Sequence, residues 1–380
     1  MAEVLKIVLT GGPCAGKTTV LSVLSEFFER RGWKVYRVPE AATVLLSGGV
    51  SFAELDARMA AQFQNNLLNV MLRLEDTYHD LARGAIAAGA TQSQVLICDR
   101  GAMDASAYTE PELWSQILAD NNFTTVELRD GRYDLVLHLV TAANGAEQFY
   151  TTENNSVRKE GIELARQLDA RVADAWLGHP YLDIIDNSTG FKEKLQRVVS
   201  AVCKRIGLED EVPSKGRKRK FLVSAVPDEL PVKVQDFDVE HDYLVTADGT
   251  QARIRRRGQN NQFTYTHTVR RPVIDGQRVE VRRSVTGRDY VALRAQREPH
   301  HCTVHKLRRN FMLDGYSYSL DIYRAPYPPR CAGGLVLLET FVRFGAEPNL
   351  PPFLKIDREV TDDPHFSMHY LSADPQAASS

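Results

Sequence analysis

The sequence has few cysteines and no long apolar run, and each shortage excludes a class of protein. Its five cysteines are odd in number and widely scattered, without CxxC spacing, which argues against a disulfide framework and for a reducing, intracellular compartment. No apolar run approaches the roughly 20 residues that span a bilayer, and Lys6 interrupts the apolar start. We therefore expect a cytoplasmic protein with neither a transmembrane segment nor a secretory signal.

The charge is nearly balanced over the whole chain but not within its two parts. The 380 residues exceed the roughly 150 of an ordinary domain, which predicts two domains. Residues 1–212 hold 21 Lys and Arg against 29 Asp and Glu, whereas residues 213–380 hold 26 against 20. A basic second half indicates a polyanionic partner or a solvated face, and charge alone leaves nucleic acid, phosphoinositide and polyphosphate open.

Short apolar segments alternate with longer amphipathic ones over residues 1–206, which is typical of an α/β domain with a parallel sheet and flanking helices. Residues 207–216, which are charged and include a proline, are the expected linker. The expected strands are 4–10, 34–38, 95–99, 135–140 and 181–185, and the expected helices are 18–30, 52–88, 111–120, 157–177 and 191–206.

Strand-like segments joined by turn signals occur between residues 221 and 344 and predict an antiparallel β-barrel domain, which we place at residues 217–375. Three dipeptides favour hairpins: Asp248-Gly249, Asp275-Gly276 and Asp314-Gly315. One helix is expected near 287–296. The expected strands are 221–226, 243–246, 251–257, 262–271, 278–284, 302–311, 316–323 and 334–344.

Residues 11–18 fit the phosphate-binding pattern G-x-x-x-x-G-K-[ST] and lie between an apolar strand and an amphipathic helix. Glycines let backbone N–H groups close around phosphate oxygens, and the helix N-terminus adds positive potential. Lys17 would reach the β- and γ-phosphates, and the Thr18 hydroxyl would complete a Mg²⁺ shell. The predicted nucleotide site comprises Gly11, Gly12, Pro13, Cys14, Ala15, Gly16, Lys17, Thr18 and Thr19.

Three further residues lie at the carboxyl ends of predicted strands, where open α/β sheets bind ligands. Asp99 can hold Mg²⁺ directly or through water, and Arg100 can neutralise phosphate charge during transfer. Glu40 is placed to accept a proton from a substrate hydroxyl. The alternative is that Glu40 and Arg100 pair with each other or cap helices.

Arginines between the fourth and fifth predicted strands indicate a lid over the phosphates. Arg158 and Arg166 are eight residues apart, so they share a helix face and join the predicted nucleotide site. Surface solvation is an equal alternative. No Asn-Lys-x-Asp motif for guanine is present, so the chemistry of the residues leaves GTP and ATP open.

Several of these segments together resemble a known family. Residues 11–18, 38–42, 98–104 and 158–174 look like the NadR-type AAA P-loop domain, which is similar in layout to nucleoside and nucleotide kinases. The opening of the second half, residues 218–223, looks like a CYTH or triphosphate-tunnel barrel. The combination resembles the TRPL translocation defect protein family. The resemblance implies a GTP-binding protein that also binds phosphoinositides and acts in membrane-protein trafficking, with peripheral association at membranes.

The barrel departs from catalytic tunnel enzymes at one motif. Those enzymes open with E-x-E-x-K, and placing its lysine on Lys220 puts Gly216 and Lys218 where the two metal-binding glutamates belong. A lysine repels a hard cation that needs oxygen ligands. Metal-dependent triphosphate hydrolysis in the barrel is therefore not expected.

The basic residues of the barrel recur at strand spacing, so alternate side chains share a face. One such set would line a cationic tunnel for phosphates: Lys218, Lys220, Arg253, Arg255, Lys306 and Arg308. Asp321 and Glu339 remain as charge partners or residual metal ligands. The alternative is a barrel whose arginines face solvent.

Three functions follow from these patterns. The first is a nucleotide-binding regulator whose barrel senses a lipid headgroup or another polyphosphate, with slow GTP hydrolysis at most. The second is a small-molecule kinase with Glu40 as base. The third and weakest is nucleic-acid binding, because the basic residues alternate on strands expected to close instead of lying with aromatics on an open surface.

Overall fold

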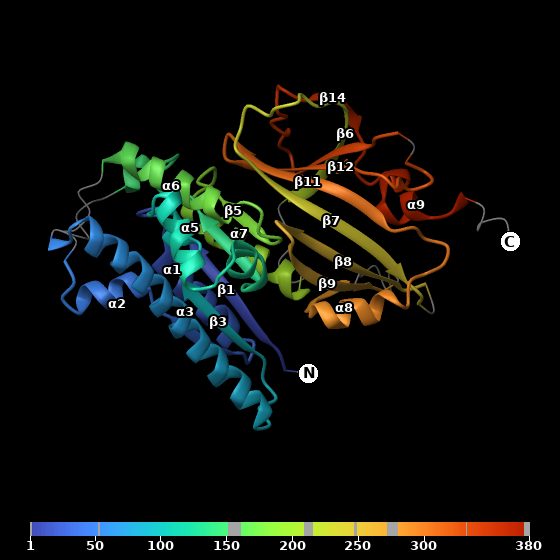
Figure 1. Ribbon diagram of the computed structural model, residues 1–380. Coiled ribbons are helices and arrows are strands. Elements are labelled where there is room, and N and C mark those ends of the chain that lie inside the picture. The colour runs from blue at the N-terminus through green and yellow to red at the C-terminus, as the bar shows by residue number, and fades with distance from the viewer. Residues whose placement is uncertain are drawn as a thin grey trace. The chain divides into compact units, whose positions relative to one another are not determined.

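The structure, a computed structural model, describes residues 2–51, 54–150, 161–208, 216–246, 249–271, 280–331 and 333–375. Its contacts divide the chain into two compact units, Met1–Val212 and Pro213–Ser380, which we call the P-loop unit and the β unit (Figure 1). The division falls within the expected linker, residues 207–216.

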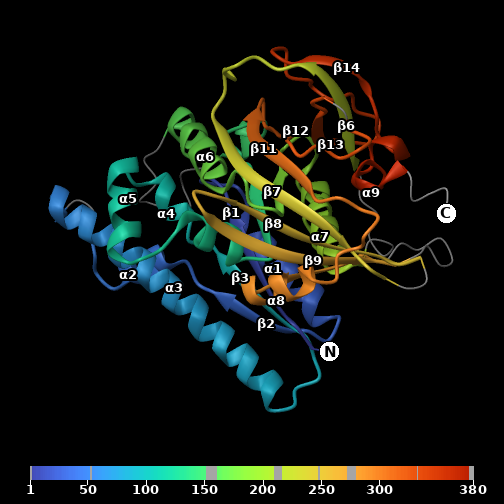
Figure 2. The ribbon, with the colours of Figure 1, turned by 45° about the vertical axis from the view of Figure 1, so that its right-hand side comes forward.

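The P-loop unit is built on a five-stranded parallel sheet in the order β2-β3-β1-β4-β5, covered by helices (Figures 1 and 2). The central strand β1 is almost wholly buried because its apolar residues face helices on both sides. The strands are β1 (Val4–Thr10), β2 (Lys34–Val38), β3 (Gln94–Asp99), β4 (Leu135–Leu139) and β5 (Leu182–Ile185). The α/β prediction is confirmed.

The helices form two layers, one on each face of this sheet. Apolar residues of α1 and α7 pack against one face, and those of α3, α5 and α6 pack against the other. The helices are α1 (Lys17–Glu29), α2 (Ala41–Ser47), α3 (Ala57–Ala87), α4 (Asp104–Ala107), α5 (Pro111–Asp120), α6 (Ile162–Trp176) and α7 (Phe191–Ile206), with a π-helical segment η2 (Val126–Gly131) and a 3-10 turn η3 (Glu147–Phe149).

Two helix predictions need correction. The helix expected from residue 52 begins at Ala57, because the Asp56 side chain accepts a hydrogen bond from the Met59 N–H at 2.7 Å and so caps the first turn. Helix α2 was not expected, because its seven residues are too few for a clear period. The helix expected over 157–177 begins at Ile162, after its N-cap Gly161, and ends at Trp176, whereas residues 157–160 lie outside the described residues.

The β unit contains a nine-stranded sheet in the order β10-β9-β8-β7-β11-β12-β13-β6-β14, and the paired strands are antiparallel. The strands are β6 (Gly216–Ala225), β7 (Val234–Leu244), β8 (Gln251–Gln259), β9 (Gln262–Arg270), β10 (Glu280–Val285), β11 (Val304–Leu313), β12 (Tyr316–Tyr323), β13 (Val336–Arg343) and β14 (Lys355–Glu359). The helices are α8 (Gly287–Arg294) and α9 (Met368–Ser372), with a 3-10 turn η4 (Pro364–Phe366).

The sheet curves so that β6 and β12 lie across from β8 and β9, with α8 outside (Figures 1 and 2). Tyr290 of α8 packs with Ile254 and Tyr265 of the strands beneath it. Strands β10 and β14 are the edges of the sheet, and no pairing between described residues joins them. The antiparallel sheet confirms the predicted class of the second domain, and closure into a barrel stays a prediction.

Strand β7 is the main correction in the β unit. The expected strand 243–246 is only the end of an eleven-residue strand, Val234–Leu244. Its acidic residues obscure the alternation in the sequence, and they are tolerated because arginines of neighbouring strands pair with them. Asp236 lies 3.3 Å from Arg309, and Glu240 lies 3.0 Å from Arg256.

The turn between β11 and β12 was predicted correctly. Asp314 and Gly315 both have positive φ, 49° and 79°, as a two-residue hairpin turn requires. The turn between β8 and β9 is of the same kind, at Asn260 and Asn261, and was not expected. Asp248 and the Asp275-Gly276 pair lie outside the described residues.

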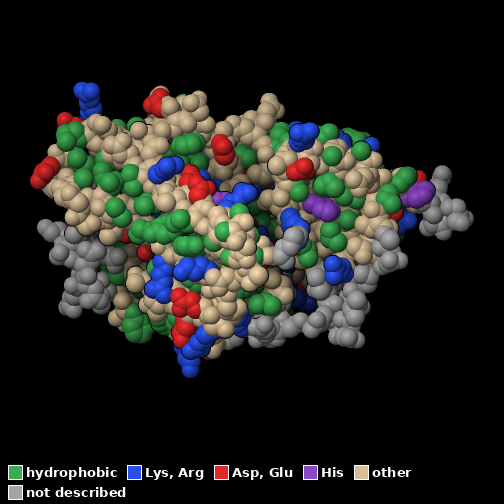
Figure 3. Space-filling model, turned by 90° about the horizontal axis from the view of Figure 1, so that it is seen from below, with side chains coloured by type: hydrophobic (Ala, Val, Ile, Leu, Met, Phe, Trp, Pro, Cys, Tyr) green, Lys and Arg blue, Asp and Glu red, His purple; other side chains and the backbone are tan. Residues whose placement is uncertain are grey.

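The surface mixes charges of both signs on the face drawn in Figure 3. Lys and Arg side chains lie there singly or in small groups, with Asp and Glu side chains nearby. No described helix is both long enough and apolar enough to cross a membrane.

Candidate nucleotide and anion sites

The carbonyl oxygens of the loop between β1 and α1 accept hydrogen bonds from side chains and backbone N–H groups of the protein. The Lys17 ammonium donates to the carbonyl oxygens of Gly11 and Gly12, each at 3.1 Å. Three more carbonyls accept hydrogen bonds: Pro13 from the Thr141 hydroxyl, Cys14 from the Ala142 N–H, and Ala15 from the Lys194 ammonium. These hydrogen bonds fix the conformation of the loop, and a bound phosphate would accept hydrogen bonds from its backbone N–H groups.

Two glycines of the loop cannot be replaced without strain. Gly11 has a φ of 134°, and a Cβ there would lie 2.0 Å from the carbonyl oxygen of Leu139. Gly16 has a φ of 89°, and a Cβ there would lie 2.9 Å from the Phe191 ring. These contacts are the physical reason for the glycines of the motif.

The Lys17 ammonium is buried and lies near charged groups of both signs. Burial and the Arg100 guanidinium lower the pKa of the Lys17 ammonium to about 8, although Asp99 and Glu40 act in the opposite direction. An anionic ligand would remove this repulsion. The position therefore favours binding of phosphate.

Glu40 and Arg100 form an ion pair, the alternative considered above. Arg100 Nε donates to Glu40 Oε1 at 2.6 Å, and the Thr43 hydroxyl donates to the same carboxylate at 2.6 Å. Burial opposes the charged form of Glu40, but Arg100 and Thr43 together hold its pKa below the ordinary value. Glu40 is thus anionic at neutral pH, and its role as a base stays a prediction.

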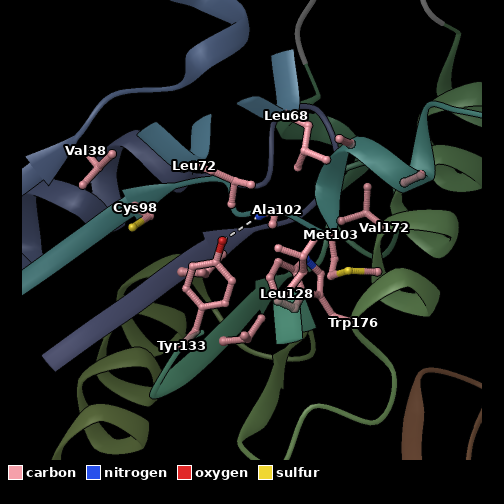
Figure 4. Packing of buried hydrophobic residues seen from close by; sticks show 14 of the residues in the cluster. Val38, Leu68, Leu72, Cys98, Ala102, Met103, Leu128, Tyr133, Val172 and Trp176 are labelled. Atoms are coloured by element: carbon pink, nitrogen blue, oxygen red, sulfur yellow. Dashed lines mark hydrogen bonds between the residues drawn. The ribbon is translucent and has the colours of Figure 1, made fainter. Parts of the chain in front are cut away.

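The segment after β3 holds Arg100 in place. Arg100 has a φ of 71°, and its N–H donates to the Leu9 carbonyl at 2.9 Å. The buried Asp104 carboxylate accepts from Arg100 at 3.3 Å and from the Gly101 N–H at 2.9 Å. Figure 4 shows the core that anchors this segment, with the hydrogen bond from the Ala102 N–H to the Tyr133 hydroxyl.

Of the two predicted lid arginines, the structure describes only Arg166. Arg158 lies outside the described residues. Arg166 is on α6, where its guanidinium donates to the Ala143 carbonyl at 2.7 Å and to Glu147 at 2.9 Å. Ala143 is two residues beyond Thr141, and the Thr141 hydroxyl donates to the Pro13 carbonyl of the P-loop. Arg166 thus reaches the rim of the loop, and its closure over phosphates stays a prediction.

In the β unit, the strand register places all six predicted anion-binding residues on one face of the sheet. Arg253 and Arg255 pair with Tyr243 and His241, while Lys306 and Arg308 pair with Val239 and Phe237 of the same strand β7. Paired and alternate residues point to the same side. The set continues through Asp321, Glu339, Lys220 and Lys218. We call this the inner face, because α8 packs on the other side.

Two carboxylates organise the cations of the inner face. Asp321 accepts from the Lys306 ammonium at 2.8 Å and from the Arg308 guanidinium at 2.6 and 2.7 Å. Glu339 lies 3.1 Å from the Lys218 ammonium and 3.4 Å from Arg308. Lys218 is 62% exposed, so it lies at an open end of the cluster, whereas Lys306 is 6% exposed. These two carboxylates are therefore charge partners.

A family model described as an AAA domain matches residues 6–194. The P-loop unit is an AAA-type nucleotide-binding domain. Solved structures similar to the chain include an inorganic triphosphatase, at 23% identity and a TM-score of 0.30, with 42% of this chain and 95% of that chain covered. No curated protein matches the chain.

The AAA domain has donors that fit a magnesium ion beside bound phosphates. Asp99 Oδ1 is buried and has no hydrogen-bond partner among the described residues, and burial raises the pKa of this carboxyl. Thr18 lies exposed in the first turn of α1. No described group of three or more His, Cys, Asp or Glu could hold a metal by itself. A metal here would depend on ligand oxygens as well as on Thr18 and Asp99.

Two residues of the AAA domain that support the P-loop were not anticipated. Asp169 Oδ1 accepts a hydrogen bond from the Gly12 N–H at 2.7 Å, and Lys194 is buried with its ammonium on the carbonyls of Val140 and Ala15. Asp169 lies three residues after Arg166, so the helix face that predicted the lid also contained it. No local pattern marks Lys194, because its contacts are with distant segments.

Proposed function

We propose that the AAA domain binds GTP with Mg²⁺ and that the β unit binds a multiply phosphorylated anion without a divalent metal. The observation that carries the first half is the P-loop, in which the Lys17 ammonium donates to the carbonyl oxygens of Gly11 and Gly12 and would exchange these acceptors for phosphate oxygens. The preference for GTP over ATP rests on the resemblance to the TRPL translocation defect protein family. Calorimetry with a panel of nucleotides tests it, and an affinity ratio near one would contradict it.

In the bound state, the Lys17 ammonium would leave the Gly11 and Gly12 carbonyls for the β- and γ-phosphate oxygens. The Thr18 hydroxyl and the Asp99 carboxylate would hold Mg²⁺, which supplies positive charge against the triphosphate. Arg100 lies close enough to Lys17 to influence its charge. Lys17, Arg100 and the metal ion would together offset the negative charge of the triphosphate.

The second half of the proposal rests on the inner face. The cations there outnumber the carboxylates, and each of Asp321 and Glu339 is already bound to a lysine and an arginine. Lys218 stands where a metal-binding glutamate would be expected, and its ammonium donates to the Glu339 carboxylate at 3.1 Å. The excess positive charge favours a polyphosphate such as a phosphoinositide headgroup. We propose that this binding serves membrane-protein trafficking at the cytoplasmic side of membranes.

A matched pair of neighbours tests the inner face. Arg255→Ala should weaken binding of phosphoinositide headgroups to the full chain, in EDTA, by about 10- to 100-fold, because it removes charge-assisted hydrogen bonds. Arg256→Ala should leave it nearly unchanged, because Arg256 faces outward and pairs with Glu240 at 3.0 Å. Binding is measured over a headgroup series of matched total charge, and it should fall as salt rises.

The opposite results would each contradict a specific part of the proposal. Equal loss in Arg255→Ala and Arg256→Ala, without selectivity for phosphate pattern, would reduce the inner face to one part of a basic surface. Strict dependence on added metal would restore metal-dependent triphosphate hydrolysis as the function of the β unit.

A kinase activity of the AAA domain is the second candidate, favoured by the anionic Glu40 at the carboxyl end of β2. If the domain transfers phosphate, Glu40→Gln should abolish transfer to a hydroxyl and change nucleotide affinity little, because a base acts on the acceptor. Transfer to a set of nucleosides and nucleotides is measured with the wild type and with Glu54→Gln as control. Absence of transfer by the wild type would leave the regulatory function.

A further inference from the structure

A buried histidine lies within the cation cluster of the inner face. His241 is 6% exposed, and its Nδ1 is buried without a hydrogen-bond partner among the described residues. It pairs across the β7–β8 ladder with Arg255. On the other side of Arg255, across the β8–β9 ladder, lies Thr266, whose buried hydroxyl also has no described partner. Two buried polar atoms without a described hydrogen-bond partner thus flank Arg255.

The cations that act most strongly on His241 come from β8 and β11, the two strands that flank β7. The strongest influences on its pKa after burial are Lys306, Arg253, Arg255 and Arg308, and together they hold it well below the ordinary value. Other charged or titratable groups on the strands of this face are Tyr243 on β7, Arg257 on β8, Arg270 on β9, Glu280 and Arg282 on β10, Asp321 and Tyr323 on β12, Glu339 and Arg343 on β13, and Lys218 and Lys220 on β6. The rings of His301 and His369 pack against the Tyr243 ring, each with its centroid 5.0 Å away.

The nearby carboxylates do not relieve this field, because each is held by its own cations. Asp321 binds Lys306 and Arg308, whereas Glu280 binds Arg270 at 2.7 Å and Arg282 at 2.6 Å. His241 is therefore neutral in the ligand-free protein at neutral pH. A neutral imidazole has one N–H donor, and protonation would give it a second.

We propose that His241 belongs to the anion site of the β unit and takes up a proton from solvent when a polyphosphate binds. The phosphate charge would reverse the local potential, so that the imidazolium becomes the favoured form and donates a charge-assisted hydrogen bond to a phosphate oxygen. The inference rests on the anion site proposed above. It adds a residue to that site and makes its affinity depend on pH.

The affinity of the β unit for polyphosphate should rise as the pH falls. His241 binds its proton more weakly in the free protein than in the complex, so the complex holds more protons and lowering the pH tightens binding. Between the free and the bound pKa values, the affinity should rise by at most about tenfold for each unit that the pH falls. Above the bound value the coupling disappears.

The test uses inorganic tripolyphosphate and the full chain carrying Lys17→Ala, so that the P-loop does not compete for the probe. Calorimetry in EDTA, between about pH 5.5 and 8 and in two buffers of different ionisation enthalpy, gives both affinity and proton uptake. His241→Gln should take up fewer protons than its parent, by as much as about one per ligand, and should show a flatter pH profile. Because tripolyphosphate itself titrates, the difference between variants is the readout.

His305→Gln is the matched control. His305 lies on the outer face of β11, 3.9 Å from Glu240, and its loss should leave proton uptake unchanged.

If His241→Gln does not fold, histidine resonances of the parent chain answer the same question, because one imidazole should titrate at higher pH once tripolyphosphate is bound. A second arm with phosphoinositide-containing vesicles distinguishes a lipid headgroup from free polyphosphate as the source of the phosphates.

Equal proton uptake by His241→Gln and its parent, with tripolyphosphate bound to both, would overturn the role of His241 and leave the anion site standing. Absence of tripolyphosphate binding at every pH would instead overturn the anion site itself, and the inference with it. Greater uptake in the parent and in His305→Gln than in His241→Gln is the result that we expect.

Discussion

Lys17→Ala should weaken binding of nucleoside triphosphate by about 100-fold, because it removes two charge-assisted hydrogen bonds, on the order of 3 kcal/mol, from the β- and γ-phosphates. The loop itself should survive, since its other carbonyls keep their bonds from Thr141, Ala142 and Lys194. Calorimetry with the triphosphate and Mg²⁺ measures the change. Lys192→Ala, an exposed lysine of α7, is the control.

The wild type should also lose affinity as the pH rises through about 8, the pKa that burial and Arg100 impose on Lys17. Binding requires the charged ammonium, and above that pH the free protein must first take up a proton. Lys17→Ala should lack this part of the pH dependence. Unchanged triphosphate binding in a folded Lys17→Ala protein would exclude the P-loop as the nucleotide site.

Asp321→Ala should lower the free energy of unfolding of the β unit by about 3–5 kcal/mol, because it leaves Lys306 and Arg308 without the carboxylate that offsets their charge. Asp238→Ala is the matched control. Asp238 is 61% exposed and pairs with the exposed Arg324, so its removal should change stability by less than about 1 kcal/mol. Denaturant unfolding of both variants beside the wild type measures the difference.

Acid should destabilise the β unit through the carboxylates of the inner face. Burial opposes the charged forms of Asp321 and Glu339, but the neighbouring cations win: the pKa of Asp321 lies far below its ordinary value, and that of Glu339 is lowered to about 2. Depressed carboxylate pKa values stabilise the fold above the unfolded values and lose this effect as the pH falls through the folded ones. Asp321→Ala should therefore unfold with a weaker dependence on acid. Equal stability of Asp321→Ala and Asp238→Ala would contradict the ion-pair account.

Local patterns predicted the glycine-containing loop between β1 and α1. The glycines at positions 11 and 16 indicate positive φ angles, and the apolar run before them indicates a buried parallel strand. The contact of Asp169 with the loop was harder to predict. Asp169 accepts from the Gly12 N–H across 157 positions of sequence, and its place on the same helix face as Arg166 does not by itself indicate that partner.

The same limit explains the errors in the β unit. Strand β7 alternates acidic with apolar or aromatic residues, and its acidic side chains look unsuited to a sheet until Arg256 and Arg309 are seen beside them. The extended form of β7 depends on neighbours that precede or follow it by many residues. Propensity alone therefore found only its last residues.

The sequence by itself determined the two classes of domain, the phosphate-binding loop, and the rule that Arg253 and Arg255 share one face, because strand side chains alternate along a single segment. Only the tertiary structure decided that Lys218, Lys306 and Arg308 share that face too. A slip of one residue between two strands would turn a whole strand to the other side. The register that prevents this is set by pairing between distant segments, and the same pairing brings His241 into the cation cluster.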